Sequence, residues 1–375
     1  MSTFTRVSRA VAATIAVAVI AALAACTSSP EASDEASPSP SAEQFEPRPL
    51  NVITVESAFL ADSRIEQRSD RDVMVYLPPQ YFETDEAFPV VYYLPGFDDQ
   101  TAVGVALPRD LDRAFETTAP MIVVIISGVN TFGGSFFVDS SSSGGWASFV
   151  AEDVVAAVDA KFRTIPEAGS RGISGHSMGG FGALDIAMRN PDVFSATFAM
   201  APGLFDETGL EDIAMFSSES RIRAMVNTVD ELTQLPESEV VGALNQEPDF
   251  FTIAYGLAFA PIDEPPYFAY PFTLDGDALV RDDEVWATWE AGYGAFDAKV
   301  AEFSGSLEAL AGIGINCGSN DAFTWIPRGC AHLSALLDTA GIDHDYIVDD
   351  GDHGRQQPER FIDEMLPFMA EHLTD

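Results

Sequence analysis

The sequence is poor in positive charge. Lysine occurs only at Lys161 and Lys299, and the 19 Lys and Arg residues stand against 59 Asp and Glu, which gives a formal net charge of −40 over 375 residues. A basic surface for nucleic acid or anionic lipid is thereby excluded, so we expect no nucleic-acid partner. Hydrophobic residues, in contrast, make up 47% of the chain. This fraction excludes a disordered protein and is enough for a large buried core.

One uncharged apolar run near the start, residues 11–25, is too short to span a membrane comfortably, and it follows Arg6 and Arg9. This pattern predicts a signal peptide over residues 1–25. The run ends in Leu23-Ala24-Ala25-Cys26, which resembles the lipobox of bacterial lipoproteins, in which the cysteine thiol receives a diacylglycerol. We therefore expect lipidation at Cys26. The alternative is a signal peptide cut nearby, with Cys26 an incidental thiol.

The segment that follows is rich in serine, proline and acidic residues. Such a composition cannot bury enough apolar surface to offset the entropy of ordering the chain. We expect a lipidated cysteine and disordered linker over residues 26–49 and one folded domain over residues 50–375. The location expected from this arrangement is extracytoplasmic, with the lipid anchor holding the domain at the cell membrane.

Only three cysteines are present, and without Cys26 the remaining pair is Cys317 and Cys330. An even number of cysteines in an exported protein favours a disulfide. Two buried free thiols are the alternative.

From residue 51 onward, short apolar runs alternate with helical patterns, which is typical of an α/β fold. The continuous apolar runs 88–94 and 121–126 indicate strands buried on both faces of a mainly parallel sheet, with helices on both faces. The alternation of strand and helix patterns is not seen over about 202–304, which we interpret as an irregular insertion. This insertion is either a lid or acyl pocket, or a subdomain with its own aromatic core. Strands are expected at 72–77, 88–94, 121–126, 171–174, 195–200, 313–317 and 344–348, and helices at 107–115, 146–162, 179–188, 330–339 and 358–372.

The pentapeptide Gly175-His176-Ser177-Met178-Gly179 lies between an expected strand and an expected helix. A G-x-S-x-G sequence in this position is typical of a nucleophile elbow, because the glycines allow a sharp turn that exposes the serine at the carboxyl edge of the sheet. Ser177 is the candidate nucleophile. A glycine-rich turn with an ordinary surface serine is the alternative.

A serine nucleophile needs a general base and a carboxylate that orients it, in the chain order Ser, acid, His. Of the five histidines, only His353 lies in a loop after the last expected strand, beside two glycines. His176 is adjacent to the serine and is expected to point elsewhere. For the acid we favour Asp321, which follows the strand ending near Cys317, over the aspartates that flank His353. These three residues form the expected catalytic triad.

Ester hydrolysis also needs hydrogen-bond donors for the developing oxyanion. The amide after the nucleophile belongs to Met178. A second amide is expected at Phe97, after the strand end and glycine turn of Leu94-Pro95-Gly96. An ordinary turn is the alternative at that position. No cofactor or metal site is expected.

Several motifs together resemble the esterase D family, whose members include S-formylglutathione hydrolases, feruloyl and other carboxylesterases, and mycolyltransferases. The similar regions cover about residues 70–202 and 312–372. The resemblance implies an α/β-hydrolase fold, with Ser177, Asp321 and His353 as the triad and the Phe97 and Met178 amides as oxyanion donors. Two positions depart from the family: Pro95 stands where histidine is frequent, and Asp352-His353-Gly354-Arg355 replaces Gly-His-Ser-Trp. The motifs are Val91-Tyr-Tyr-Leu-Pro-Gly-Phe97, Ser135-Phe-Phe-Val-Asp139 with Trp146, Gly175-His-Ser-Met-Gly-Gly180 with Phe181-Gly182, Asn190-Pro-Asp-Val-Phe194, Cys317-Gly-Ser-Asn-Asp321 and Gly351-Asp-His353.

The leading hypothesis is a tethered extracytoplasmic serine esterase that forms an acyl-enzyme on a small-molecule or lipid ester. Two alternatives remain open. One is an acyltransferase, similar to a mycolyltransferase, that passes the acyl group to a sugar or alcohol. The other, from a different class, is a non-catalytic ligand-binding lipoprotein.

Overall fold

The computed structural model describes residues 50–65, 68–99, 108–354 and 357–374. The expected signal peptide (1–25), the linker (26–49) and the lipidation site Cys26 lie outside these ranges. Within the described ranges, none of the helices combines the length and the apolar character that crossing a membrane requires.

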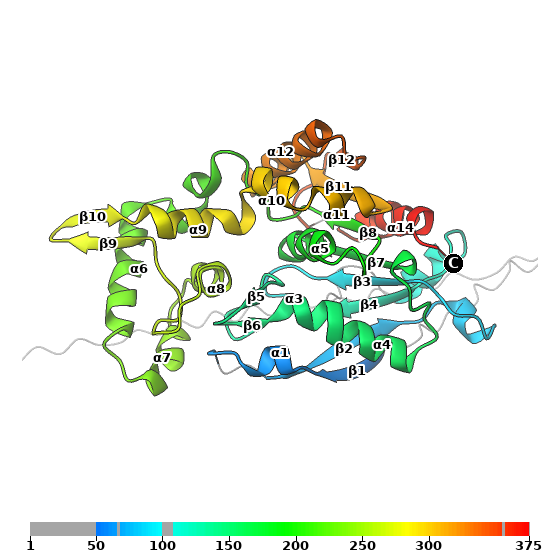
Figure 1. The fold of residues 1–375 in the computed structure, drawn as a ribbon, viewed down its shortest axis with the longest axis horizontal. Coiled ribbons are helices and arrows are strands. Elements are labelled where there is room, and N and C mark those ends of the chain that lie inside the picture. Colours follow the sequence, from blue (N-terminus) through cyan, green and yellow to red (C-terminus); the bar gives the residue numbers. More distant parts are fainter. Residues whose placement is uncertain (1–49, 66–67, 100–107, 355–356, 375) are drawn as a thin grey trace, which may run out of the picture. The chain divides into compact units, whose positions relative to one another are not determined.

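An eight-stranded sheet in the order β1-β2-β4-β3-β7-β8-β11-β12 forms the centre of the fold (Figure 1). β1 (Asn51–Glu56) and β2 (Asp70–Tyr76) are antiparallel, and β2 is antiparallel to β4 (Ile122–Ile126). All other pairs are parallel, through β3 (Val90–Leu94), β7 (Arg171–His176), β8 (Ala196–Met200), β11 (Gly312–Gly318) and β12 (Asp345–Asp349). This arrangement confirms the predicted α/β fold with a mainly parallel sheet.

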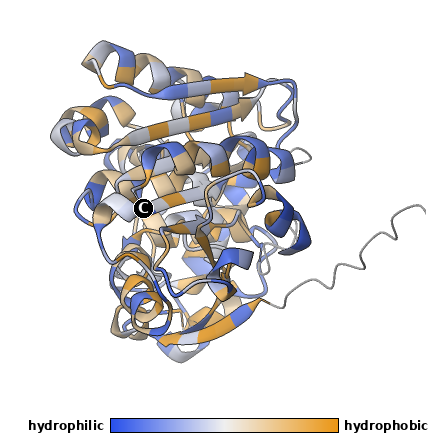
Figure 2. Ribbon diagram, turned by 90° about the vertical axis from the view of Figure 1, so that its right-hand side faces the viewer, coloured by the Kyte–Doolittle hydropathy of each residue, from blue (hydrophilic) through white to orange (hydrophobic). Residues whose placement is uncertain are grey.

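The central strands bury side chains on both faces of the sheet. Along β3, Tyr92 and Leu94 belong to one core while Val91 and Tyr93 belong to the other, because successive side chains alternate across a strand. Figure 2 shows hydrophobic and hydrophilic residues together on the covering helices, as expected when only one face of a helix is buried. The first core is covered by α3 (Trp146–Ser148), the π-helical turn η2 (Phe149–Val154), α4 (Val155–Lys161), α5 (Met178–Arg189) and α12 (Trp325–Ala340). The second is covered by α2 (Pro108–Ala114), η6 (Arg360–Met365) and α14 (Leu366–His372).

The insertion over about 202–304 lacks the alternation of strands and helices found in the rest of the chain, and about half of its residues are helical. Its longest elements are α6 (Glu219–Leu232), α7 (Glu237–Leu244), α8 (Phe250–Phe259), the hairpin β9 (Phe272–Asp275) and β10 (Ala278–Arg281), α9 (Asp283–Tyr293) and α10 (Phe296–Glu302). Residues 252–258 of α8 are all buried. A helix that is buried on every side has no polar face, so polar and apolar residues do not recur with the helical period. The sequence of α8 therefore shows no helical pattern.

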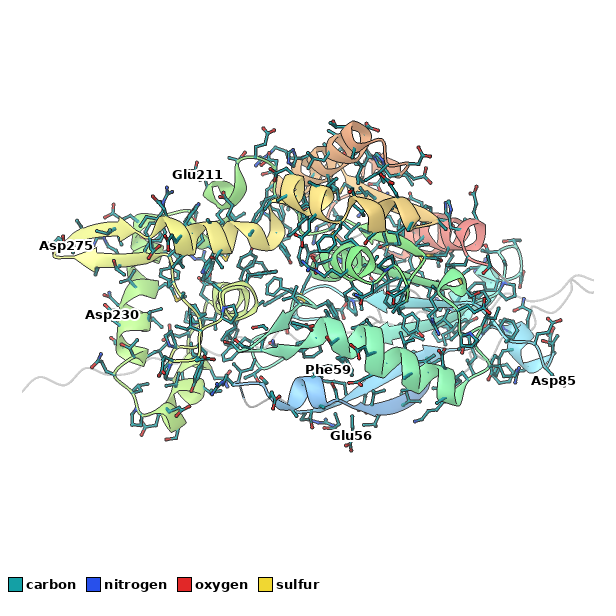
Figure 3. All side chains as sticks on the ribbon, in the orientation of Figure 1. Glu56, Phe59, Asp85, Glu211, Asp230 and Asp275 are labelled. Atoms are coloured by element: carbon teal, nitrogen blue, oxygen red, sulfur yellow. A yellow bond between two sulfur atoms is a disulfide. The ribbon has the colours of Figure 1, made fainter. Side chains whose placement is uncertain are left out.

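Short elements complete the fold. They are α1 (Ala58–Ala61), η1 (Pro79–Phe82), β5 (Asp139–Ser140), β6 (Gly144–Gly145), η3 (Ala168–Ser170), η4 (Gly209–Asp212), η5 (Ala214–Phe216), α11 (Ser304–Ala309) and α13 (Gln357–Glu359). In Figure 1, α8 lies between α6 and β5, so the insertion adjoins the small two-stranded sheet of β5 and β6. Exposed acidic side chains lie at the periphery on well-separated elements, as Glu56, Asp85, Glu211, Asp230 and Asp275 illustrate (Figure 3).

Candidate active site

Ser177 occupies the sharp turn between β7 and α5. Its backbone has φ +55° and ψ −115°, a left-handed conformation that a residue with a side chain adopts only under strain. Three hydrogen bonds hold it there: the Ser177 amide donates to Met200 O (3.0 Å), and the Ser177 carbonyl accepts from Phe181 N (3.1 Å) and Gly203 N (3.0 Å). The strained turn is thus fixed from both sides, and the serine side chain is held at the end of β7.

The two flanking glycines are required by close packing against β3. A Cβ on Gly179 would overlap the carbonyl group of Leu94, and a Cβ on Gly175 would overlap the backbone of Gly179. Neither neighbour is the flexible end of a side chain, so larger residues would force the strand and the helix apart. The G-x-S-x-G pattern therefore follows from the contact between the elbow and β3.

Ser177, His353 and Asp321 form a continuous hydrogen-bonded chain. The distance from Ser177 Oγ to His353 Nε2 is 3.0 Å, and the distance from His353 Nδ1 to Asp321 Oδ2 is 2.7 Å. A carboxylate oxygen only accepts, so Nδ1 carries the proton and the unprotonated Nε2 accepts from the serine hydroxyl. The Asp321 side chain is fully buried, and its other oxygen accepts from Phe323 N (2.8 Å). The structure thus brings together the three side chains that the sequence named.

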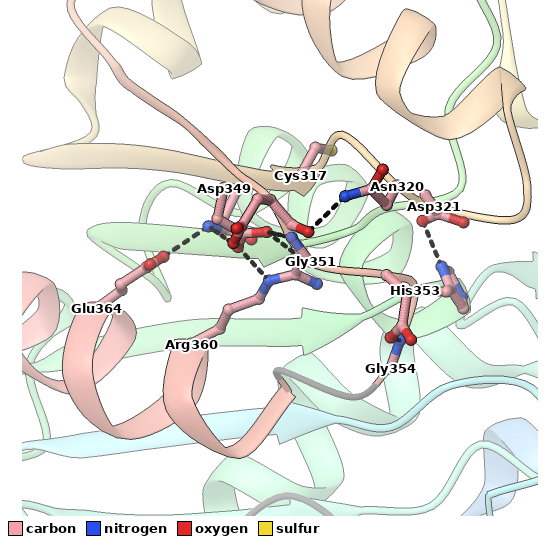
Figure 4. Close-up of polar contacts among 12 residues, drawn as sticks. Cys317, Asn320, Asp321, Asp349, Gly351, His353, Gly354, Arg360 and Glu364 are labelled. Atoms are coloured by element: carbon pink, nitrogen blue, oxygen red, sulfur yellow. Dashed lines mark hydrogen bonds and ion pairs between the residues drawn. The ribbon is translucent and has the colours of Figure 1, made fainter.

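The loops that carry Asp321 and His353 follow the neighbouring parallel strands β11 and β12. Backbone bonds join them: Ser319 N donates to Asp349 O (2.9 Å) and Asn320 N donates to Gly351 O (3.0 Å). The Asn320 side chain adds a bond from Nδ2 to the carbonyl of Asp350 (2.6 Å) (Figure 4). The hydrogen bonds between these two loops therefore set the relative positions of the acid and the base, in addition to the direct Asp321–His353 contact.

A buried arginine holds the base of the His353 loop. Arg360, 1% exposed, donates from Nε and Nη2 to the two oxygens of Asp349, each at 2.7 Å (Figure 4). Burial acts to raise the pKa of Asp349, but the hydrogen bonds from Arg360 and from the Gly351 amide outweigh it, and the pKa lies below its usual value. Burial and the nearby Asp349 charge raise the pKa of Glu364, which accepts from Asn316 Nδ2 (2.6 Å).

His176 points toward the base rather than away from the site, contrary to expectation. Its Nε2 lies 2.6 Å from the backbone oxygen of His353, and the two rings are 4.8 Å apart. A carbonyl only accepts, so Nε2–H is the donor. Burial and the neighbouring His353 lower the pKa of His176 to about 3, so this ring is neutral. The sequence feature that indicates this proximity is the position of His176 directly before Ser177 in the pentapeptide.

The Phe97 and Met178 amides both belong to segments beside Ser177. Met178 is the first residue of α5, where a backbone N–H has no acceptor within the helix. Phe97 lies in the turn after β3, and a Cβ on Gly96 in that turn would be 3.5 Å from Ser177 Cβ. The turn is fixed by the bond from Asp98 N to Gly133 O (2.8 Å). Both residues thus belong to segments that adjoin Ser177.

A cavity of about 550 Å³ opens onto Ser177 and His353. Most of its wall is apolar or aromatic, and much of that wall comes from the insertion. Phe323, 49% exposed, stands edge-on to the His353 ring at 4.9 Å between centroids. The insertion contributes Phe205, Ile213, Ala214, Met215, Arg221, Asp249, Phe251 and Tyr293. A mostly apolar pocket with a few convergent polar groups is typical of a small-molecule site.

The structure joins Cys317 and Cys330 by a disulfide between the end of β11 and α12. Both residues are fully buried. The bridge closes the segment that contains Asp321. In the described ranges, no group of three or more His, Cys, Asp or Glu side chains is arranged to hold a metal ion.

The sheet, the elbow and the hydrogen-bonded serine, histidine and aspartate define an enzyme of the α/β-hydrolase fold. Residues 66–255 match the family described as "Putative esterase", and the chain belongs to this esterase family. The predicted family resemblance is thereby confirmed, and the protein is an esterase enzyme.

Solved structures share this fold at low sequence identity. A ferulic acid esterase is 19% identical (TM-score 0.55), covering 87% of this chain and 98% of that one. An S-formylglutathione hydrolase from Agrobacterium tumefaciens is 20% identical (TM-score 0.52; 87% and 95% covered). The fluorophosphonate-binding serine hydrolase F of Staphylococcus aureus is 15% identical (TM-score 0.51; 86% and 99% covered). Comparison with curated proteins gave no match.

Proposed function

We propose that this esterase is a serine carboxylic-ester hydrolase that forms an acyl-enzyme on Ser177. The observation that carries the proposal is the hydrogen-bonded chain Ser177–His353–Asp321, which lies at the wall of a mostly apolar cavity. In this proposal Ser177 is the nucleophile, His353 the general base and Asp321 the carboxylate that fixes the tautomer of His353.

The chemistry proceeds in two halves. Ser177 Oγ attacks the ester carbonyl carbon while its proton passes to His353 Nε2, and the oxyanion accepts hydrogen bonds from the Phe97 and Met178 amides. His353 then protonates the departing alkoxide, which leaves the acyl group on Ser177. In the second half, His353 takes a proton from water, the hydroxide attacks the acyl carbon, and the proton returns to Ser177 Oγ. Asp321 stabilises the imidazolium form of His353 in both halves.

We further propose that the enzyme acts outside the cytoplasm, held at the cell membrane by a diacylglycerol on Cys26. The support is in the sequence: an apolar run that ends in Leu23-Ala24-Ala25-Cys26, followed by a Ser- and Pro-rich linker. Two acyl chains on one residue are sufficient for stable attachment. In the proposed arrangement, Cys26→Ala moves the protein from the detergent phase to the aqueous phase in a phase-partition assay of bacterial membranes. Unchanged partitioning of this variant contradicts lipidation at Cys26.

Hydrolysis of short nitrophenyl esters by wild type and Ser177→Ala tests the catalytic proposal. We expect kcat/KM to fall by roughly 10⁴-fold or more, because loss of the nucleophile removes the acyl-enzyme route. Ser306→Ala on α11, outside the cavity, is the matched control. Retained hydrolysis in Ser177→Ala rules out this nucleophile.

Two further readouts separate the alternatives. A fluorophosphonate probe should label wild type and not Ser177→Ala, whereas a ligand-binding lipoprotein would give no labelling at Ser177. Adding a sugar or alcohol acceptor should leave the products as free acid. Acyl transfer to the acceptor at a rate above hydrolysis identifies an acyltransferase instead.

A further inference from the structure

An ion pair from the insertion lines the cavity beside Ser177. Arg221 and Asp249 line this cavity, and both also line a second hollow of about 350 Å³. Among the described residues, these two alone are common to both hollows. We propose that the Arg221–Asp249 pair is the end wall of the acyl pocket and sets the longest acyl chain that Ser177 accepts. This inference rests on the proposed ester hydrolysis.

The pair is held at the N-termini of two insertion helices. Asp249 Oδ2 accepts from Arg221 Nε (3.0 Å) and lies 2.9 Å from Nη2, while Asp249 Oδ1 accepts from Thr252 N (3.4 Å) and so caps α8. The Arg221 amide donates to the capping hydroxyl of Ser218 (3.3 Å) at the start of α6. Because each residue of the pair lies at the N-terminal end of a helix, the position of the ion pair is fixed.

An apolar path connects this wall to the nucleophile. Phe251, two residues after Asp249, contacts Phe97 with ring centroids 5.0 Å apart. The side chains along the path are Phe97, Phe205, Ile213, Met215, Phe251 and Tyr293. Each methylene that leaves water for such a surface should raise kcat/KM about fourfold. A chain that reaches the ion pair cannot replace its hydrogen bonds, so this gain ends at the wall.

The second hollow shows what lies beyond the wall. Besides the pair, it is lined by Ala224, Met225, Thr228, Glu247 and Pro248. The side chain of Arg221 is 42% exposed and that of Asp249 is 18% exposed, as expected for groups that separate an inner cavity from an outer one. Removing the arginine side chain would therefore join the two hollows and lengthen the space available to the acyl chain.

The structure points to esters of apolar acyl chains of limited length as the substrate class. The test measures kcat/KM for nitrophenyl esters from acetyl to palmitoyl, and the labelling rate of Ser177 by alkyl fluorophosphonates of the same lengths. Three variants separate the contributions: Arg221→Ala removes the wall, Arg221→Met keeps much of its volume, and Asp249→Asn keeps the α8 cap but weakens the pair. Arg223→Ala is the matched control, because Arg223 lies on the same helix, pairs with Glu219 and lines neither hollow.

We expect wild type and Arg223→Ala to gain about fourfold per methylene up to the same chain length and to gain nothing beyond it. In Arg221→Ala this limit should move outward by at least two methylenes, which raises the ratio of long-chain to short-chain kcat/KM by at least tenfold. Asp249→Asn should move the limit in the same direction. Arg221→Met should keep it within one methylene of wild type.

A limit that is unchanged in both Arg221→Ala and Asp249→Asn overturns the end-wall proposal. So does a selective loss of esters with a terminal hydroxyl or carboxylate, which would make Arg221 a recognition group for polar acyl ends. If Arg221→Ala does not fold, Asp249→Asn alone decides the question. Absence of Ser177 labelling in wild type, in contrast, contradicts the proposed function itself and is distinct from an unmoved limit in an active enzyme.

Discussion

At the residue scale, His353 is fixed by two different neighbours. Its ring nitrogen Nδ1 donates to Asp321, and its backbone oxygen accepts from the buried ring of His176. The first contact sets the tautomer of His353, and the second holds its loop against the end of β7. His176 is thus a positioning residue: it acts through His353 and is not expected to exchange protons with substrate.

The neutral His176 should make the fold sensitive to acid. Its pKa is about 3 in the folded state and 6.5 in an unfolded chain, so the unfolded state binds more protons between these values. Stability therefore falls as pH drops from 6.5 toward 3, by roughly 3 kcal/mol at pH 4. In His176→Gln, the difference between the unfolding free energies at pH 7 and pH 4, measured with urea, should shrink by about that amount.

His332→Gln is the matched control for this measurement. His332 lies on α12 and faces Glu207 at 3.9 Å rather than the triad. If the unfolding free energy falls equally between pH 7 and pH 4 in His176→Gln and in wild type, burial of His176 is not the cause of the acid sensitivity.

Arg360 is a second positioning residue. Arg360→Met leaves the Asp349 carboxylate without its two strongest donors, and we expect a loss of roughly 3 kcal/mol in unfolding free energy. Because the loop geometry of His353 loosens, kcat on a short ester should fall about tenfold while KM changes little. The measurement is steady-state kinetics well below the unfolding temperature.

The double variant Arg360→Met/Asp349→Asn tests the cause. A neutral amide needs no counter-charge and still accepts from Gly351 N, so part of the stability and of kcat should return. A fall in kcat that persists undiminished in the double variant is evidence against positioning through Asp349.

At the element scale, the disulfide links β11 to α12 behind the loop of Asp321. Cys317 and Cys330 are 13 residues apart, and closing a loop of this size stabilises a fold by about 3 kcal/mol in the chain-entropy estimate. Cys317→Ala/Cys330→Ala should lose about that much unfolding free energy in a denaturant titration. Reductant should destabilise wild type by a similar amount and leave the double variant unchanged. If reductant affects both proteins equally, the bridge is not the cause.

The insertion combines capped helices with aromatic side chains that contact one another. Its helices α6, α8 and α9 begin at side-chain caps, since Ser218, Asp249 and Asp282 each accept a hydrogen bond from an amide of the following first turn. Its aromatic residues include Phe216, Tyr270, Trp286 and Trp289, whose rings contact one another at centroid distances of 5.0–5.9 Å. The insertion thus packs its aromatic side chains against one another, joins the core on one face of the sheet and also lines the cavity.

At the scale of the whole molecule, the excess of acidic groups should oppose folding by mutual repulsion. The formal net charge is −40, and exposed acids lie on many separate elements (Figure 3). Raising NaCl from 0.01 to 0.3 M shortens the Debye length from about 30 Å to below 8 Å, so repulsion between distant charges is screened. We expect the unfolding temperature to rise by about 3 °C or more.

Sucrose at matched osmolarity is the control, because it stabilises by exclusion and screens no charge. An unfolding temperature that does not rise with NaCl, or rises no more than with sucrose, contradicts a net repulsive surface.

Patterns along the chain located seven of the eight strands of the central sheet, all except β1, and named Ser177, Asp321 and His353. They could do so because buried parallel strands are continuous apolar runs, and because an elbow packed against β3 requires Gly175 and Gly179. The position of a loop after a strand also predicts which edge of the sheet carries its side chains. These signals are local, so they can be read along the chain.

Contacts between segments far apart in the sequence could not be predicted from local patterns. The hydrogen bond from His176 to the carbonyl of His353 joins positions 177 residues apart, and the lining of the cavity by Arg221 and Asp249 depends on how the insertion helices pack. The buried helix α8 lacked a sequence period for the same reason, since neighbours from all sides replace solvent. Contacts of this kind depend on packing in three dimensions, which no local pattern specifies.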